Sequence, residues 1–566
     1  MSAVAAVPAA QRPLLWERSY PPGVRWDVPL EVSTVSALLD RSVAEFPDKP
    51  AFEFRDRRTS YRELGRMVDA AAAALLRLGI GVGDAVALYL PNVPYHPIAF
   101  FAAMRIGTRI VHLSPLDAER ELAHKLRDSG ARTLVTVTLP PLLQMALKLR
   151  AAGNIDRLIV GADAAWGPSP VEPMPIPDEP GVIPFAHLLD GGAPPAQFPP
   201  VGVDDVAVLQ YTGGTTGTPK AAMLTHGNLT SAVSMYETWY EPQGLSMHGV
   251  ERVACVLPLF HIYALTTILL RQVANANEIL LRMKFDVETA LRDIEEKRAT
   301  IYLGVPTMWI ALVNHPEIAK RDLSSLRNCN SGGAPLPVEV EERFKRLTGI
   351  RLGGGWGMTE TSPAGTVVPE TAPETKRGSI GLPLPGLLME IVALDDPRRV
   401  LPPREVGEIR IKGPNVTRQY WNRPEETAAA FVDGFLLTGD IGYMDEDGYF
   451  FLVDRKKDMI ICGGFNVYPS VVEGAIYEHP DVAEAIVIGI PDPYRGQAAK
   501  AFVTLRTGAP PMTLDGLRAF LADKVGRHEM PAALELRDAL PRTAVGKLSK
   551  KDLVEEEKRR ASVAPL

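Results

Sequence analysis

Residues 211–220 read YTGGTTGTPK, and glycine, threonine and a final lysine make up most of these ten positions. Glycines let backbone N–H groups come close to an anion, threonine hydroxyls add hydrogen-bond donors, and Lys220 adds a mobile positive charge. The apolar run at 206–209 predicts a short buried strand, so we expect the loop at a strand end. Pro219 separates the last threonine from Lys220, which excludes the Walker A pattern. The stretch therefore predicts a phosphate-binding loop of another kind.

The bulk composition narrows the class of protein. A chain of 566 residues predicts two or more compact units, and 46% hydrophobic with 23% charged residues is typical of globular proteins. The net charge of −7 gives no indication of nucleic-acid binding. Cys255, Cys329 and Cys462 are too scattered for a disulfide framework and fit a reducing compartment. No apolar run is long enough to predict a transmembrane segment, so we expect a cytoplasmic enzyme, with loose association with the inner membrane left open.

The pattern along the chain predicts an α/β fold. Residues 70–78 and 98–105 are helical in character and 85–90 read as a strand, which indicates a parallel sheet covered on both faces. The proline-rich residues 167–200 predict an extended surface segment. The α/β alternation resumes from 206 to about 365, and the short β segments at 376–455 indicate a small barrel. We expect a lead-in at 1–35, a large domain at 36–456 and, after a hinge at Lys457, a small α+β domain at 457–566.

Four further clusters carry candidate site chemistry. In WGMTETS (356–362), Trp356 can stack on a flat base, and Thr359 and Glu360 bring ligand types that Mg²⁺ prefers. SGGAP (331–335) is a tight glycine-rich turn, and the aspartate of Thr-Gly-Asp (438–440) is a common partner for ribose hydroxyls. PRTAVGK places Lys547 near the end of the sequence. Each cluster alone has an ordinary structural interpretation, but their ordered co-occurrence indicates a nucleotide-using enzyme.

In order and spacing these motifs resemble the adenylate-forming superfamily of acyl-CoA synthetases, luciferases and peptide-synthetase adenylation domains, over roughly residues 36–555. PLFHIYAL, DRKKDMI and GFNVYPSVVE are most similar to bacterial medium- and long-chain fatty-acid–CoA ligases. The resemblance implies a large N-terminal domain of stacked α/β subdomains with a small β-barrel, and a small mobile α+β C-terminal domain. It also implies that a carboxylate attacks Mg·ATP to give acyl-AMP, from which the thiol of coenzyme A displaces AMP.

The resemblance also implies a role for each matching residue. The phosphate clamp would consist of Thr212, Gly213, Gly214, Thr215, Thr216, Gly217 and Lys220, with Thr215 and Glu360 as magnesium ligands. Trp356 and Gly357 would face adenine from one side and Gly333, Ala334 and Pro335 from the other. Thr359 would contact the α-phosphate, and Asp440 with Arg455 would hold the ribose. Lys547 would bridge the substrate carboxylate and the α-phosphate, Lys457 would act as hinge, and Gly464 with Phe465 would reach the pantetheine tunnel.

The substrate is predicted from the residues after the clamp. The stretch LPLFHIYALTTILL (257–270) holds no acidic residue that could pair with an amine, which argues against amino acids and favours an apolar acyl chain. Trp239, Ile262 and Tyr263 are expected pocket residues, as is His261, to which we assign a positional role. Relatives usually carry tyrosine at the position of Trp356 and a larger residue within 353–355. The glycines there, Gly354 and Gly355 among them, would either loosen a turn or widen the acyl pocket.

Several alternatives stay open at this point. A medium-chain dicarboxylate would need a distal cation, for which Arg271, Arg282 or Lys284 could serve, and an aryl acid is also compatible with the sequence. The acyl group could pass to the pantetheine of a separate carrier protein, or the chain could be a non-catalytic acyl or nucleotide sensor. A monomer or homodimer is expected.

Overall fold

The structure is a computed structural model that describes residues 13–190, 194–212, 219–333, 336, 338–463, 465–542 and 548–563. The chain divides into two compact units. The first comprises residues up to Leu388 together with Lys412–Phe431, and the second comprises Met389–Ile411 and the chain from Val432 onward. Among the described residues, no helix has the length and apolar character needed to cross a bilayer.

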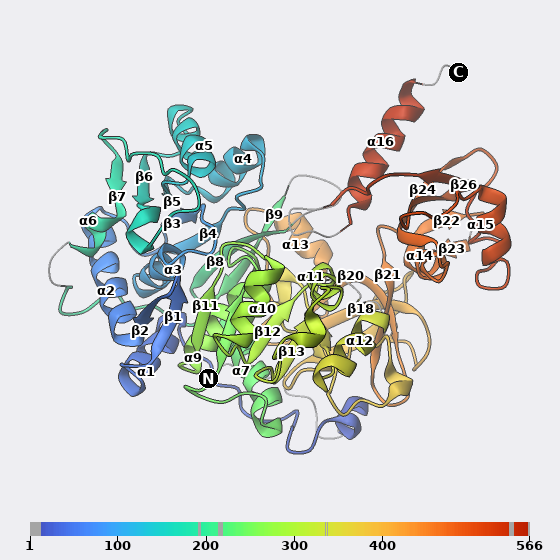
Figure 1. The fold of residues 1–566 in the computed structure, drawn as a ribbon, viewed down its shortest axis with the longest axis horizontal. Helices are drawn as coiled ribbons and strands as arrows, with labels where there is room; N and C mark the ends of the chain where they lie inside the picture. Colours follow the sequence, from blue (N-terminus) through green and yellow to red (C-terminus); the bar gives the residue numbers. More distant parts are fainter. Residues whose placement is uncertain are drawn as a thin grey trace. The chain divides into compact units, whose positions relative to one another are not determined.

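The first unit contains a seven-stranded sheet in the order β7-β6-β5-β3-β4-β8-β9, in which the β8–β9 pair is antiparallel and the other pairs are parallel. Helices α4 and α5 cover one face, and α3, with α2 packed on it, covers the other (Figure 1). The predicted helix at 70–78 overlaps α2, the one at 98–105 lies within α3, and the predicted strand at 85–90 overlaps β3. The bounds are β3 Ala85–Leu88, β4 Arg109–His112, β5 Thr133–Val137, β6 Arg157–Gly161, β7 Val182–Pro184, β8 Val206–Thr212, β9 Lys220–Thr225, α2 Tyr61–Arg77, α3 Tyr95–Arg105, α4 Glu119–Ser129 and α5 Pro140–Ala151.

The proline-rich segment differs from its prediction as a wholly extended excursion. Residues 182–184 form β7, which pairs with β6, and α6 (Phe185–Leu189) follows directly. Strand β7 lies at the edge of the sheet, where the missing N–H of Pro184 costs little because no further strand needs it. The prolines therefore confine this strand to an edge and do not keep the segment out of the sheet.

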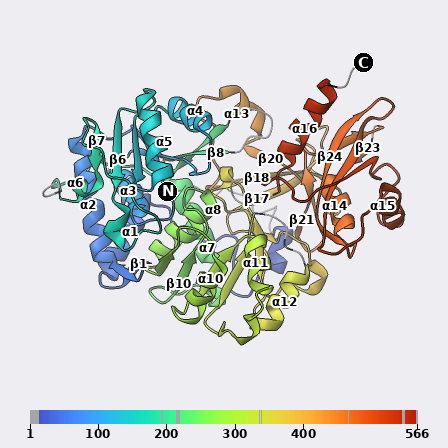
Figure 2. The ribbon, with the colours of Figure 1, turned by 45° about the horizontal axis from the view of Figure 1, so that its top comes forward.

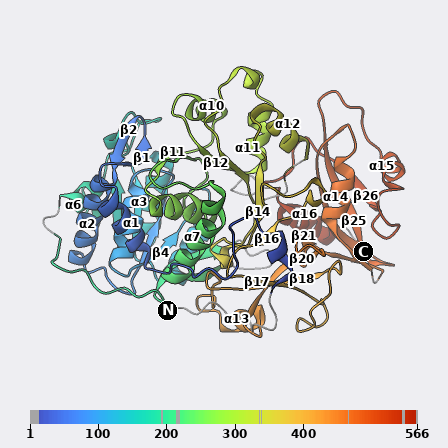
Figure 3. The same cartoon turned by 90° about the horizontal axis from the view of Figure 1, so that it is seen from below.

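A second sheet of nine strands runs in the order β16-β15-β14-β13-β12-β10-β11-β1-β2. Helices α10, α11 and α12 gather on one side of it, and α7 lies on the other (Figure 3). Helix α7 packs against the segment α8–α9. A π-helical stretch at Leu265–Leu270 joins α8 to α9. The bounds are β1 Pro50–Phe54, β2 Arg57–Ser60, β10 Arg252–Cys255, β11 Glu278–Leu281, β12 Ile301–Gly304, β13 Asn328–Ser331, β14 Gly353–Trp356, β15 Thr366–Val367, β16 Leu382–Pro383, α1 Val35–Glu45, α7 His226–Tyr240, α8 Ile262–Ala264, α9 Arg271–Ala274, α10 Val287–Glu295, α11 Pro306–Val313 and α12 Val338–Thr348.

The small β region begins later than the predicted residue 376. Strand β16 pairs with β15 and so belongs to the second sheet. The third sheet has five strands and starts at residue 388, with β17 Leu388–Val392, β18 Gly407–Lys412, β19 Phe431–Val432, β20 Phe435–Met444 and β21 Phe450–Arg455. A sequence pattern of short β segments broken by glycine and proline did not reveal which sheet each segment joins.

The C-terminal part of the chain forms a fourth sheet (Figure 2). Its long hairpin of β24 and β25 contributes Val487, Ala501 and Val503 to a core that Leu517 and Leu521 of α15 complete. The bounds are β22 Ile460–Cys462, β23 Phe465–Val467, β24 Val482–Asp492, β25 Gly496–Leu505, β26 Ala533–Leu536, α14 Pro469–Tyr477, α15 Leu514–Leu521 and α16 Lys550–Val563. The hinge at Lys457 and the domain limits drawn from the sequence stay predictions.

Candidate active site

The candidate phosphate loop connects two antiparallel strands. Thr212 at the end of β8 lies opposite Lys220 at the start of β9, and the Thr212 hydroxyl donates to the Lys220 carbonyl at 3.3 Å. The predicted clamp residues Gly213, Gly214, Thr215, Thr216 and Gly217 lie outside the described residues. The loop therefore belongs to a hairpin, which differs from the strand-to-helix setting of a Walker A loop.

Lys220, Glu360 and Tyr420 form one contact group. The Lys220 ammonium lies 3.6 Å from the centroid of the Tyr420 ring, and the Tyr420 hydroxyl donates to Glu360 Oε1 at 2.8 Å. Both Glu360 and Tyr420 are buried, at 5% exposure each. Burial lowers the pKa of Lys220, and the charge of Glu360 opposes that shift. Burial raises the pKa of Tyr420, as do the charge and hydrogen bond of Glu360, so the phenol keeps its proton and donates it.

Hydrogen bonds from the segment that follows β18 hold the turn that carries Thr359 and Glu360. The residues 359–361 form a single 3₁₀ turn, and Ser362 ends it in the left-handed conformation at φ 57°. The Asn415 amide donates to the carbonyls of Thr361 and Ala364 at 2.7 Å each, and the Ser362 hydroxyl donates to the Asn415 carbonyl at 2.9 Å. The half-buried Thr359 and the carboxylate of Glu360 are thus held on a rigid turn.

The glycines near Trp356 cannot be replaced by larger residues without a steric clash. Its backbone N–H donates to Thr366 Oγ1 at 3.1 Å, and the indole is only 8% exposed. A Cβ on Gly365 would lie 2.5 Å from the indole, and one on Gly357 would lie 1.4 Å from the Pro363 carbonyl oxygen. Gly333 is exposed at the end of β13 with φ +82°, whereas Ala334 and Pro335 lie outside the described residues.

The glycines at 353–355 form most of strand β14, so the prediction of a loosened turn is wrong. A Cβ on Gly353 would lie 2.1 Å from Asn330 Oδ1, and one on Gly355 would lie 2.4 Å from the Thr366 carbonyl oxygen. A Cβ on Gly354 would meet nothing closer than 3.9 Å. Two of the glycines are therefore required by close neighbours, and Gly354 is the one that leaves space.

One predicted pocket residue, Trp239, lines a small cavity together with Gly353. Another, Tyr263, packs against Gly332, where a Cβ would lie 2.9 Å from its ring. The other residues that line this cavity are Tyr240, Gln243, Leu245, Asn328, Cys329, Asn330, Val368 and Glu370. Ile262 is 1% exposed, and His261 Nδ1 accepts the Tyr263 N–H at 3.2 Å. The positional role of His261 stays a prediction.

In the second unit, Asp440 and Arg455 are paired across strands β20 and β21. Arg455 Nε lies 2.9 Å from Asp440 Oδ1, and Asp440 is 1% exposed while the Arg455 side chain is 53% exposed. The next residue, Lys456, pairs with Glu408 at 2.8 Å. A buried carboxylate held by an accessible arginine can accept hydrogen bonds from a sugar diol.

Lys547 and Gly464 lie outside the described residues, but the chain on both sides of Lys547 is anchored. Arg542 bridges to Leu548, the Ser549 N–H donates to the Pro541 carbonyl at 2.8 Å, and Lys550 pairs with Glu473 at 3.0 Å. Phe465 is 63% exposed and Lys457 is also exposed.

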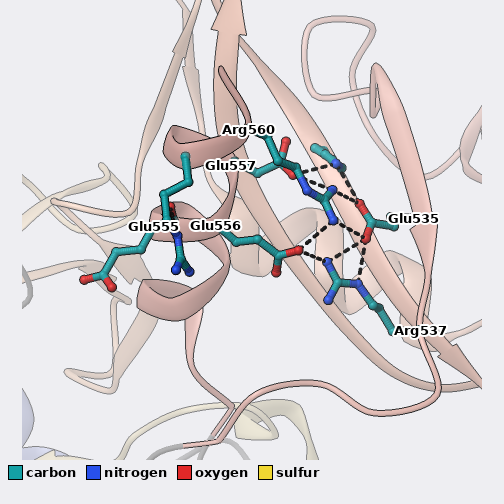
Figure 4. A network of polar contacts seen from close by, with 8 residues as sticks. Glu535, Arg537, Glu555, Glu556, Glu557 and Arg560 are labelled. Atoms are coloured by element: carbon teal, nitrogen blue, oxygen red, sulfur yellow. Dashed lines mark hydrogen bonds and ion pairs between the residues drawn. The ribbon is translucent and has the colours of Figure 1, made fainter. Parts of the chain in front are cut away.

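Helix α16, which follows this segment, is tied to the fourth sheet by charge (Figure 4). Glu535 on β26 contacts Arg537 and Arg560, and Glu556 contacts the same two arginines. Burial opposes ionisation of Glu535, yet hydrogen bonds from Arg560 and Lys500 bring its pKa down to about 2. The network gives the Lys547 segment a fixed C-terminal support.

The sequence interpretation missed Tyr420, Asn415 and Thr417, all from the segment NVTRQYWNRPEET at 415–427. The Thr417 N–H donates to the backbone carbonyl of Glu360 at 2.7 Å. The density of polar and aromatic residues in this segment was the available signal, but it did not indicate which motif they serve. Within the described ranges, no three His, Cys, Asp or Glu side chains are grouped to hold a metal.

Comparison with known proteins decides the family. The AMP-binding enzyme family matches residues 39–421, and its C-terminal domain matches residues 471–547. The chain belongs to the AMP-binding enzymes. The predicted membership of the adenylate-forming superfamily is thereby confirmed.

Three AMP-binding enzymes show how far the likeness extends. A long-chain-fatty-acid–CoA ligase of Bacillus subtilis is 39% identical over 562 residues, covering 97% of this chain and 98% of that protein. A feruloyl-CoA synthase of an Amycolatopsis species is 37% identical over 496 residues, covering 87% and 92%. ATP-bound MatB from Rhodopseudomonas palustris superposes with a TM-score of 0.82 at 28% identity, covering 93% and 99%. The predicted fold class, stacked α/β sheets with a smaller C-terminal domain, is confirmed.

Proposed function

We propose that this chain is an AMP-forming fatty-acid–CoA ligase that makes acyl-CoA, AMP and pyrophosphate from a fatty acid, ATP and coenzyme A. The observation that carries the proposal is the near full-length likeness to a long-chain-fatty-acid–CoA ligase at 39% identity. The site supports it, because Lys220, at the end of the candidate phosphate loop, and Glu360 both contact the side chain of Tyr420. Both of these charged residues argue against a non-catalytic sensor.

The reaction requires that two anions approach one another. Lys220 would bind the β- and γ-phosphates with the loop at 213–218, and Glu360 would hold Mg²⁺ with the nucleotide oxygens completing its coordination. Mg²⁺ would neutralise phosphate charge. Trp356 would stack on adenine and Thr359 would contact the α-phosphate. Asp440 with Arg455 would bind the ribose, and Lys547 would bridge the carboxylate and α-phosphate, since a lysine is a compact charge on a flexible stem.

The second half-reaction would use the C-terminal part of the chain. We propose that rotation about Lys457 withdraws Lys547 and brings Gly464 and Phe465 to the pantetheine of coenzyme A. One pocket can then serve two different transition states and keep water from the acyl-AMP. The oligomeric state and the cytoplasmic location stay predictions.

The apolar stretch at 257–270 favours an apolar acid. Ile262, Leu265 and Ile268 are each no more than 1% exposed, and no acidic residue lies in the stretch 257–270. Burying an ammonium among such side chains without a partner would be costly. The amino acid substrates of related adenylation domains are therefore disfavoured.

A dicarboxylate substrate is disfavoured, because none of the three cations proposed for its second carboxylate is suited to bind it. Buried Arg271 is paired with Glu237, and Arg282 is bound by Glu53 and Asp293. A further carboxylate at either arginine would add an uncompensated buried charge. Lys284 is exposed, so water already solvates its ammonium.

An aryl acid is the second candidate. The aromatic side chains of Trp239 and Tyr240 and the amide of Asn330 line one small cavity. The 37% identity to a feruloyl-CoA synthase supports this candidate.

A substrate panel separates the candidates. Pyrophosphate release would be measured with the full chain across C4–C18 monocarboxylates, the matching dicarboxylates and hydroxycinnamic acids, with and without coenzyme A, and acyl-CoA would be identified by mass. We expect CoA-dependent turnover that is fastest with monocarboxylates. If no acid gives CoA-dependent turnover, the ligase proposal is wrong. Faster turnover of dicarboxylates or hydroxycinnamates would overturn the choice of substrate alone.

A further inference from the structure

Tyr420 belongs to a short extended segment that runs along the edge strand of the first sheet. It forms an isolated antiparallel bridge with Ala222 of β9. The Met223 N–H donates to the Gln419 carbonyl at 3.1 Å, and the Trp421 N–H donates to the Ala221 carbonyl at 2.8 Å. The backbone of Tyr420 is thus fixed beside the strand that starts at Lys220.

The segment is also anchored by its side chains. The Tyr420 N–H donates to Thr427 Oγ1 at 3.0 Å in α13 (Pro424–Ala430). The Trp421 indole donates to the Asp128 carbonyl at 2.9 Å, and Arg423 pairs with the Asp128 carboxylate at 3.1 Å. These contacts hold the phenol ring in one place before any ligand arrives, which is what a preorganised site requires.

The two contacts of the Tyr420 side chain have opposite charges. Its ring face lies against the Lys220 ammonium at 3.6 Å, and its hydroxyl donates to Glu360 Oε1 at 2.8 Å. A ring face attracts a cation, and a phenol proton binds a carboxylate. An ionised carboxylate that accepts a hydrogen bond from a phenol keeps its negative charge, which is what attracts a metal cation.

Because Lys220 and Glu360 contact the same tyrosine, the alternative arrangement for them would be a direct ion pair with each other. Such a pair would engage both the positive charge meant for the phosphates and the negative charge meant for the metal. Tyr420 offers each group a separate partner, because the ring takes the ammonium and the hydroxyl takes the carboxylate. Lys220 and Glu360 then do not have to separate from each other when Mg·ATP binds.

We propose that Tyr420 is a positioning residue that holds Lys220 and Glu360 apart in ligand-ready orientations, so that one residue prepares both the phosphate clamp and the magnesium ligand. The inference rests on the proposed function, in which Glu360 binds Mg²⁺ and Lys220 binds the phosphates. It predicts that the hydroxyl of Tyr420 supports Mg²⁺ binding and that its ring supports ATP binding, so that the two effects can be separated.

Two substitutions of Tyr420 test the role of the hydroxyl separately from that of the ring. Tyr420→Phe keeps the ring under Lys220 and removes the proton donated to Glu360, so the Mg²⁺ concentration for half-maximal pyrophosphate release should rise about tenfold, as for loss of a hydrogen bond to a charged group. The KM for ATP at saturating Mg²⁺ should change by less than about threefold. Tyr420→Leu removes both contacts, so the Mg²⁺ requirement and the KM for ATP should rise together.

The controls distinguish positioning from general destabilisation. Tyr61→Phe removes the hydroxyl of another buried tyrosine, which donates to the Asn277 carbonyl at 2.8 Å. Neither Tyr61 nor Asn277 belongs to a site motif. This substitution should lower the melting temperature without changing the Mg²⁺ requirement. If Tyr420→Phe does not fold, Thr427→Val tests the same point, because it removes the acceptor of the Tyr420 N–H and should raise the Mg²⁺ requirement about two- to threefold.

The outcomes separate this inference from the function on which it rests. Glu360→Gln should raise the Mg²⁺ requirement strongly, and an unchanged requirement would refute Glu360 as the metal ligand. A shift in Glu360→Gln with none in Tyr420→Phe would overturn the role of Tyr420 alone. An equal loss of turnover in both Tyr420 variants, with the Mg²⁺ requirement unchanged, would show that Tyr420 is only structural.

Discussion

Thr212 and Lys220 face each other across the β8–β9 pair, where the Thr212 hydroxyl donates to the Lys220 carbonyl at 3.3 Å. The pairing fixes both ends of the glycine- and threonine-rich loop within the first sheet. It also sets Lys220 at the first position of β9, from which its ammonium reaches the Tyr420 ring. The two residues that flank the loop, Thr212 and Lys220, are therefore held in place independently of any bound nucleotide.

Loss of the Lys220 charge should weaken the use of ATP. We expect Lys220→Ala to lower kcat/KM for ATP about 100-fold, the scale seen when one preorganised group that stabilises developing charge is removed. Steady-state pyrophosphate release measures the effect. Lys284→Ala removes an exposed lysine and serves as the matched control, which should stay within twofold of the parent. Equal losses in the two variants would argue against a specific role for Lys220.

Lys547 should matter for only one of the two half-reactions. We expect Lys547→Ala to abolish ATP–pyrophosphate exchange and to leave thioester formation from supplied acyl-AMP largely intact, because the lysine would be withdrawn in the second step. Lys551→Ala, in the exposed part of α16, is the control. An equal loss of both half-reactions in Lys547→Ala would contradict the assignment.

The three glycines of β14 should differ in their tolerance of a methyl group. Gly355→Ala places its Cβ 2.4 Å from the Thr366 carbonyl oxygen, so the backbone must shift and the free energy of unfolding should fall by roughly 2 kcal/mol or more. Gly354→Ala has no neighbour closer than 3.9 Å and should change it by less than about 0.5 kcal/mol. Thermal or urea unfolding distinguishes the two, and equal effects would show that the spacing around β14 differs from that described here.

Stability should fall in mild acid because buried histidines are held neutral. Burial lowers the pKa of His112 and of His226 to about 4 and that of His96 well below its ordinary value. Unfolded histidines protonate near pH 6.5, so this stability is complete above about pH 7 and is lost as the pH falls through 6.5 toward 4. Each ring at a pKa near 4 should cost on the order of 2 kcal/mol at pH 5.

Urea unfolding between pH 4.5 and pH 8 tests this dependence. His96→Phe is the informative variant, because neither ring nitrogen has a hydrogen-bond partner among the described residues and the ring stacks on His112 at 5.2 Å. Phenylalanine keeps the stack and removes one titrating group, so the variant should be as stable as the parent at pH 7.5 and less sensitive to acid. A parent stability that is flat from pH 4.5 to pH 7 would contradict the account.

Much of the chemistry could be predicted because motifs carry it in consecutive residues. Trp356 ends strand β14 shortly before the turn that carries Thr359 and Glu360, and Thr212 and Lys220 close one hairpin, so local patterns identified them. The predicted fatty-acid–CoA ligase is confirmed by its relatives, while the individual site assignments stay predictions.

The rest depended on contacts between distant segments. Tyr420 lies 60 residues from Glu360 in the sequence, and nothing in its local pattern indicates that its hydroxyl binds that carboxylate. The same limit explains β7 and β16, whose short proline-containing sequences join sheets only because an unpaired edge is available. Sheet membership and supporting contacts are set by tertiary packing, which outweighs local propensity in short segments.

The central claim is that the acid's carboxylate attacks the α-phosphorus of ATP, and an isotope measurement tests it most directly. A fatty acid labelled with ¹⁸O in both carboxylate oxygens would be turned over by the full chain with ATP, Mg²⁺ and coenzyme A, and the nucleotide and phosphate products would be analysed by mass. The account predicts AMP that carries one ¹⁸O atom, acyl-CoA that keeps the other ¹⁸O atom in its thioester carbonyl, and pyrophosphate without label. ADP with labelled inorganic phosphate would instead show attack at the γ-phosphorus and contradict the account.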